Sequence, residues 1–135
     1  MSFDYFEHDA DIGVIGRGAT LEEAFEGAAE GMFAIMADAA QVRPLVQFAF
    51  AFAEDDVELA LVTWLNRLLA EARQRGLALA RFRLKRVDGQ WQGEAWGAPW
   101  GANMERGTEV KGATLTMLRV GQSEGAWEAR CVVDV

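Results

Sequence analysis

The chain has 135 residues, 51% of them hydrophobic, which suits a single domain, residues 1–135, with one core. Its formal net charge of −8 argues against direct, stable nucleic-acid binding, which requires clustered Lys and Arg side chains. The start lacks a basic leader and no segment approaches the length of a membrane span, so we expect a cytoplasmic protein without a membrane partner. The single cysteine, Cys131, is expected to be a small buried hydrophobe.

The first informative segment lies near the start of the chain. It places the only histidine, His8, within four residues of Asp9 and Asp11. An imidazole and carboxylates together can bind a metal or transfer a proton. The same residue types are common in turns, where Asp bonds to its own backbone, so a purely structural role stays open. An apolar strand follows this segment and leads into a helix.

The first predicted helix begins at a capping box. Thr20 and Glu23 have the spacing of this motif, and apolar residues then recur at intervals of three and four as far as about Asp38. After it, phenylalanines alternate with smaller or polar residues over 46–52. This alternation predicts a strand whose aromatic face lies under a helix.

A second helix is predicted after this strand. Asp55 and Glu58 are expected to cap its start, and Gly76 stands where a C-terminal cap belongs. From residue 79 the pattern changes to strands, and residues 87–90, Val-Asp-Gly-Gln, are typical of a tight hairpin turn. Two helices on one face of a mainly antiparallel sheet make a two-layer α+β domain.

Two further features lie around this hairpin. Basic residues alternate with apolar ones before the turn. This alternation indicates that the basic side chains form the solvated face of a strand, and it favours that role over a phosphate-binding stripe. These basic residues are Arg81, Arg83, Lys85 and Arg86. Residues 97–103 are predicted to be a loop, flanked by Trp96 and Trp100. Packing of these tryptophans over an end of the sheet is favoured over stacking on a ligand, which stays open.

The last predicted hairpin joins residues 110–120 and 126–135 through a turn at 121–125. Counting outwards from the turn places Lys111 and its neighbour opposite Asp134 and Val135, within one residue. A lysine, a carboxylate and the terminal carboxylate are therefore expected to meet at one sheet edge. A role in solubility alone, which is common at strand ends, is the alternative.

Several short motifs occur along the chain in a distinctive order and at distinctive distances. They are His8-x-Ala10-Asp11-Ile12-Gly13, Thr20-Leu21-Glu22-Glu23-Ala24-Phe25, Trp64-Leu65-Asn66-x-Leu68-Leu69, Gly76-Leu77, Thr108-Glu109-Val110-Lys111 with Ala113-Thr114, and Val133-Asp134-Val135. Together they cover nearly the whole chain, and in this combination the chain resembles the archease family.

The resemblance implies a fold like the main domain of the redox chaperone Hsp33 and a non-enzymatic role. It implies activation of the GTP- and Mn²⁺-dependent RNA ligase of tRNA splicing and RNA repair, which joins a 3′-phosphate or 2′,3′-cyclic phosphate end to a 5′-hydroxyl end. The partner would be this 3′-phosphate RNA ligase, whose guanylylation and multiple turnover the protein would promote. A divalent cation, Ca²⁺ with Mg²⁺ or Mn²⁺ as alternatives, would be its cofactor.

The resemblance also assigns roles to residues that match the family motifs. Asp11, Asp134 and the terminal carboxylate of Val135 correspond to metal ligands, Lys111 to a functionally required lysine, and His8 to the motif histidine. Oxygen ligands of this kind suit hard cations. The family usually has a histidine near position 116 and often another near position 104, where this chain has threonine and methionine.

Two other classes of function stay open at this stage. One is a metal-dependent hydrolase with Asp11 as base, although a single histidine cannot complete a Ser-His-Asp triad or a histidine-rich zinc site. The other is a chaperone-like binding module. A redox chaperone would need a cysteine-rich zinc motif, and Cys131 stands alone.

Overall fold

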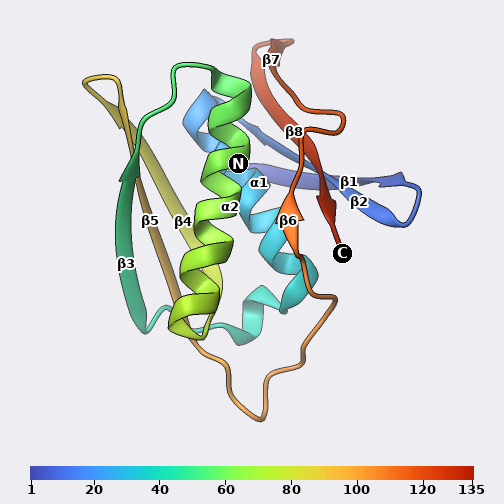
Figure 1. The fold of residues 1–135 in the computed structure, drawn as a ribbon, viewed down its shortest axis with the longest axis vertical. Coiled ribbons are helices and arrows are strands. Elements are labelled where there is room, and N and C mark those ends of the chain that lie inside the picture. Colours follow the sequence, from blue (N-terminus) through green and yellow to red (C-terminus); the bar gives the residue numbers. More distant parts are fainter.

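The computed structural model describes all residues, 1–135, and arranges them as eight strands, two α-helices and one short 3-10 helix (Figure 1). In chain order the elements are β1 (Ser2–His8), β2 (Asp11–Gly18), α1 (Leu21–Met36), the 3-10 helix (Ala39–Gln41), β3 (Val46–Phe52), α2 (Val57–Arg75), β4 (Leu77–Val87), β5 (Gln90–Pro99), β6 (Gly112–Ala113), β7 (Arg119–Ser123) and β8 (Ala126–Asp134).

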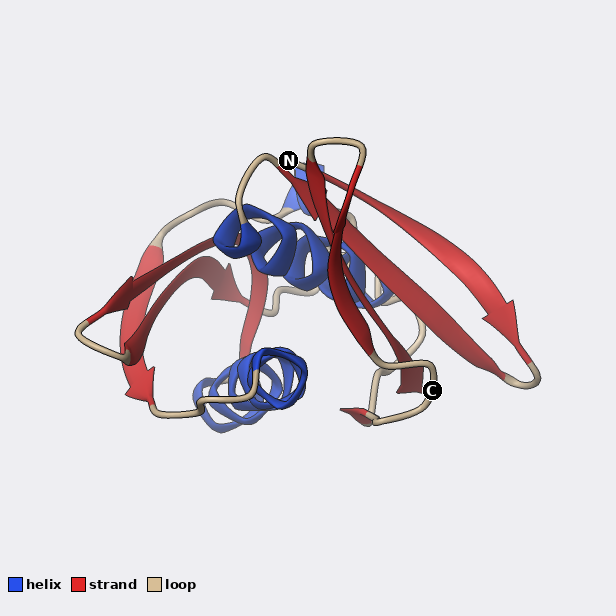
Figure 2. Cartoon of the chain, turned by 90° about the horizontal axis from the view of Figure 1, so that it is seen from above, coloured by secondary structure: helices blue, strands red, loops and turns tan.

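The strands form two antiparallel sheets with helices packed on them, which confirms the predicted α+β class. One sheet has the order β1-β2-β8-β6, with β7 also pairing with β8, and the other has the order β3-β5-β4. Helix α1 lies between the two sheets, and α2 lies beside it (Figure 2). The sequence was interpreted as one sheet with both helices on one face. The division into two sheets follows from α1, whose buried residues are too many for a single apolar face.

Close packing of α1 on the five-stranded sheet depends on a glycine. A Cβ atom at Gly16 would lie 2.1 Å from the carbonyl oxygen of Ala24 and 2.2 Å from the backbone nitrogen of Ala28. Only a residue without a side chain fits there, so Gly16 sets the distance between β2 and α1. It also identifies the face of β2 that is turned towards the helix.

The core between the sheets is built around aromatic side chains. Trp64 and Trp91 are fully buried, and Phe25 stacks on Trp91 with ring centroids 5.4 Å apart. The indole N–H of Trp64 donates to the carbonyl of Phe25 at 2.9 Å, and that of Trp91 donates to the carbonyl of Glu54 at 3.0 Å. Each buried donor therefore has a partner, as burial of a polar group requires.

The helix ends agree with the sequence, with one correction. Thr20 is the N-cap of α1 and accepts from the backbone N–H of Glu23 at 3.1 Å, as predicted, whereas the Glu23 carboxylate accepts from the N–H of Ala19 at 3.0 Å instead of that of Thr20. Gly76 ends α2 with a left-handed φ of 68°. The prediction that Asp55 caps α2 is wrong. Asp56 is the N-cap, because its carboxylate accepts from the N–H groups of Glu58 and Leu59, at 2.9 and 3.1 Å.

The 87–90 hairpin and the exposed basic face of β4 are confirmed, since Phe82 and Leu84 are buried and the basic side chains around them are not. One further strand was not predicted, and one boundary differs from prediction. The segment 2–8 forms a strand, because its residues pair with β2 along their whole length. Strand β5 continues to Pro99 through pairing with β4, so the loop begins only at Trp100.

The last hairpin also differs in detail from the prediction. Its first strand is interrupted at 114–118, where Met117 adopts a positive φ of 55°, and is divided into β6 and β7. The turn is narrower than 121–125. Glu124 and Gly125, both with positive φ, form it, while Ser123 pairs with Ala126.

Candidate functional site

The residues singled out in the sequence meet at one end of the five-stranded sheet. His8 pairs with Asp11 across β1 and β2, and Gly112 pairs with Asp134 across β6 and β8. The pairing of β2 with β8, continued by one residue, places Asp11 opposite Asp134. Directly opposite residues of antiparallel strands share a face. His8, Asp11, Asp134 and Gly112 therefore form one row across four strands, which we call the four-strand row.

The four-strand row faces away from α1. Gly16 touches the helix backbone, and side chains alternate along β2, so Asp11 points to the opposite face of the sheet. Asp11 and His8 are half-buried, and Asp134 is exposed. The two aspartates are therefore accessible to a cation or to a partner protein.

Backbone hydrogen bonds close the site around the end of β8. The backbone N–H of Val135 donates to Oδ1 of Asp11 at 3.2 Å, and that of Lys111 donates to the carbonyl of Asp134 at 2.8 Å. The predicted meeting of Lys111 with this strand end is confirmed, because Gly112 lies opposite Asp134. The Lys111 side chain is exposed and takes part in no ion pair.

His8 ends β1, and Asp9 begins the turn between β1 and β2. Nδ1 of His8 lies 3.9 Å from a carboxylate oxygen of Asp9, and the His8 side chain is 36% exposed. Asp9 has a positive φ of 53° and so shapes the turn itself. The turn interpretation therefore applies to Asp9, whereas His8 stands in the four-strand row.

The carboxylate oxygens of the four-strand row are ligands of the kind that hard cations bind. No group of three or more His, Cys, Asp or Glu side chains is placed to hold a metal. Asp11 and Asp134 offer two carboxylates, one of whose oxygens already accepts from Val135. Because Ca²⁺ takes six to eight oxygen ligands, the remaining ones would come from the oxygens of Val135, from backbone carbonyls and from water.

Two residues of α2 that the sequence analysis did not assign to the site hold its outer strand in place. The side-chain amide of Asn66 accepts from the N–H of Ala113 at 2.9 Å and donates to the carbonyl of the same residue at 3.2 Å. Nη2 of Arg73 donates to the carbonyls of Val110 and Lys111, at 2.5 and 2.9 Å. The sequence signals were the place of Asn66 in the Trp64–Leu69 motif and, for Arg73, a polar residue next to the apolar face of a helix.

Cys131 takes no part in this chemistry. Its side chain is buried with 1% exposure, and burial raises the pKa of its thiol to about 12. The thiol therefore stays protonated at neutral pH and fills space in the core, as predicted.

Comparison with known proteins places the chain in a family. The model of the Archease protein family matches residues 3–135. The chain belongs to the archease family. Protein archease of Sulfolobus acidocaldarius is 33% identical, with 98% of each chain covered, and that of Aeropyrum pernix is 31% identical, with 96% of this chain and 94% of the other covered.

Solved structures agree with this archease assignment. The solution structure of Methanobacterium thermoautotrophicum protein 1598 has a TM-score of 0.83 and 28% identity, with 99% of each chain covered. The crystal structure of a Thermotoga maritima archease, described as a possible chaperone, shares the fold with a TM-score of 0.67 and 21% identity, over 96% of this chain and 94% of that one. Neither helix of this archease is both long and apolar enough to cross a membrane.

Proposed function

We propose that this archease is a non-enzymatic activator of the GTP- and Mn²⁺-dependent RNA ligase that joins 3′-phosphate or 2′,3′-cyclic phosphate RNA ends to 5′-hydroxyl ends. It would promote guanylylation of the ligase and its multiple turnover in tRNA splicing and RNA repair. The observation that carries the proposal is the four-strand row, which gathers the motif residues of the family from both ends of the chain on one accessible face. The net charge of −8 favours a protein partner with a basic active site over RNA itself.

Asp11, Asp134 and the carboxylate of Val135 are the proposed ligands of a divalent cation, Ca²⁺ with Mg²⁺ or Mn²⁺ as alternatives. Oδ1 of Asp11 accepts a hydrogen bond from the N–H of Val135, which fixes the end of β8 beside β2. The second carboxylate oxygen of Asp11 is therefore left for the ion. Carboxylates gathered without a counter-charge would repel one another. When bound, the cation would supply that counter-charge and a positive centre for phosphate oxygens.

Lys111 is proposed to contact the ligase-bound nucleotide or phosphate, not the cation. An ammonium has no lone pair for a metal, but it can neutralise phosphate oxygens as a point charge. Its backbone is fixed on both sides, because its N–H donates to Asp134 and its carbonyl accepts from Arg73. The base of the side chain is therefore held in place while the exposed ammonium remains free to reach a partner.

The deciding experiment is a guanylylation assay of the partner ligase with and without this protein. The variant Asp11→Asn removes one charge but keeps an oxygen that can accept from Val135, so it should fold normally and fail to activate the ligase. The matched control is Asp88→Asn, in the β4–β5 turn of the other sheet, where Asp88 has a positive φ that asparagine also tolerates. Normal activation by Asp11→Asn would contradict the proposed site.

A chaperone-like binding role is the second candidate. It is favoured by one observation, the description of the Thermotoga maritima relative as a possible chaperone, and that protein shares the fold at 21% identity. Suppression of client-protein aggregation by this chain, unchanged in Asp11→Asn, together with no effect on the ligase, would favour this role. Phosphate release by the chain alone would instead favour a hydrolase.

A further inference from the structure

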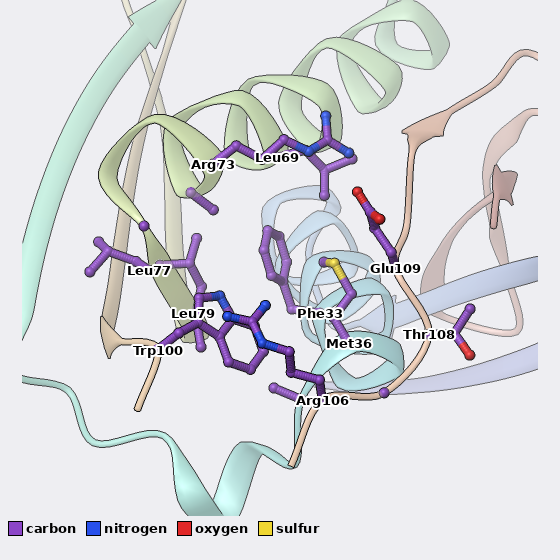
Figure 3. Close-up of a pocket in the computed structure, with 15 residues that line it drawn as sticks. Phe33, Met36, Leu69, Arg73, Leu77, Leu79, Trp100, Arg106, Thr108 and Glu109 are labelled. Atoms are coloured by element: carbon purple, nitrogen blue, oxygen red, sulfur yellow. The ribbon is translucent and has the colours of Figure 1, made fainter. Parts of the chain in front are cut away.

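A cavity lies against the segment that leads to Lys111. A cavity of about 490 Å³ opens between the C-terminal ends of α1 and α2, the start of β4 and the 106–109 segment (Figure 3). Its volume falls in the range of small-molecule sites. Apolar side chains form most of its wall, among them Phe33, Leu69 and Leu79.

The rim of this cavity carries more positive than negative charge. Arg73 and Arg106 line it together with a single carboxylate, Glu109. The guanidinium of Arg106 lies 4.1 Å from the ring centroid of Trp100 and takes part in no ion pair. The rim of the cavity therefore has the opposite sign of charge to the chain as a whole, whose net charge is −8.

Arg106 is held in this position by its backbone. The residue forms an isolated bridge with Ala37, and the next two N–H groups, of Gly107 and Thr108, donate to carbonyls at the end of α1, at 2.8 and 3.0 Å. A Cβ atom at Gly107 would lie 2.2 Å from the carbonyl oxygen of Ile35, so only glycine allows this approach. The guanidinium is therefore presented at the cavity by an anchored segment of chain.

We propose that this cavity binds a small molecule with an apolar, ring-sized body and one anionic group. The body would occupy the space lined by Phe33 and Leu79, and the anionic group would meet the guanidinium of Arg106 at the rim. Arg73 adds positive charge on the same rim, although its Nη2 already donates to two backbone carbonyls. A guanidinium that lies over an indole keeps the N–H donors at its edge available to a carboxylate, sulfonate or phosphate. This site is independent of the proposed role in ligation.

The test uses anilinonaphthalene sulfonate, an aromatic body with one sulfonate, and the uncharged phenyl-naphthylamine as its matched probe. We expect one-to-one binding of the sulfonate, seen as enhanced fluorescence and a raised melting temperature, and affinity for the neutral probe at least about tenfold weaker. Arg106→Gln should weaken binding of the sulfonate by about tenfold and leave binding of the neutral probe unchanged. The control is Arg81→Gln, because Arg81 also lies over an indole, 5.4 Å from the ring centroid of Trp96, but outside the cavity.

A second variant tests the cavity itself. Thr108 lines the cavity from an exposed position, so Thr108→Trp should fill its mouth without disturbing the core and abolish binding of both probes. The proposal is overturned if both probes bind equally well, if Arg106→Gln binds the sulfonate as the parent does, or if Arg81→Gln loses as much affinity. If Thr108→Trp does not fold, the comparison of Arg106→Gln with Arg81→Gln decides alone.

Discussion

Replacing Asn66 by alanine should destabilise the protein by loosening β6 from α2. The Asn66 amide makes two hydrogen bonds with the backbone of Ala113, at 2.9 and 3.2 Å, in a half-buried position. A net contribution of ~1 kcal/mol for each bond gives a loss of ~2 kcal/mol in the free energy of unfolding. With an unfolding entropy of ~2.1 cal/mol/K per residue, a domain of 135 residues should then melt ~7 °C lower.

For Asn66→Ala, calorimetry measures the change in melting temperature, and hydrogen exchange measures the loosening at a single amide. The N–H of Ala113 should exchange faster, and ligase activation should fall, because Lys111 stands two residues before this contact. Asn66→Asp keeps an acceptor for the N–H of Ala113 but sets a carboxylate oxygen against the carbonyl of Ala113, so it should also lower stability. Asn103→Ala, in the exposed loop before β6, is the control. An unchanged exchange rate at Ala113 in Asn66→Ala would refute the role of this amide.

Asp11→Ala should lower ligase activation strongly and the free energy of unfolding by only ~1 kcal/mol, because it removes one hydrogen bond from Val135; the guanylylation assay and a urea titration measure the two effects. Lys111→Ala should lower activation and preserve Ca²⁺ binding by calorimetry, with arginine recovering part of the activity; full activation would refute its role. A few residues added after Val135 should impair activation more than a tag before Met1, and equal activity of the two forms would remove the carboxylate of Val135 from the site. Burial raises the pKa of Glu30, so its folded-state pKa lies above the unfolded value and stability falls as the pH rises through it; Glu30→Gln should therefore gain stability relative to the parent as the pH rises from acid to neutral, measured by urea titration.

The meeting of Lys111 with the end of β8 was predicted correctly, but through two register differences that cancel. A turn at 121–125 would pair Val120 with Ala126, whereas Val120 pairs with Ala129, and the interruption at 114–118 then shifts the register back, so that Gly112 lies opposite Asp134. The interruption at 114–118 was not predictable. It depends on a positive φ at Met117, which no residue preference indicates.

The contributions of α2 could not be read from the sequence for a different reason. Asn66 and Arg73 reach backbone groups more than thirty residues away, and such contacts depend on how the helix is turned against β6. Periodicity predicts which face of a helix is buried, but not which polar residue at its border meets a strand. The division into two sheets could not be predicted either, because the pattern of a strand does not show which distant strand it pairs with.

The contact between Asp11 and Val135 has a consequence for biosynthesis, since the two residues stand 124 positions apart. At ~5–20 residues per second, a ribosome needs on the order of ten seconds to make the chain between them. Throughout that time the edge of β2 that later pairs with β8 has no partner, and an unpaired edge can join another chain. A chain without β8 would lack Asp134 and the strand that joins the β1–β2 hairpin to β6. The four-strand row therefore exists only after β8 has paired with β2.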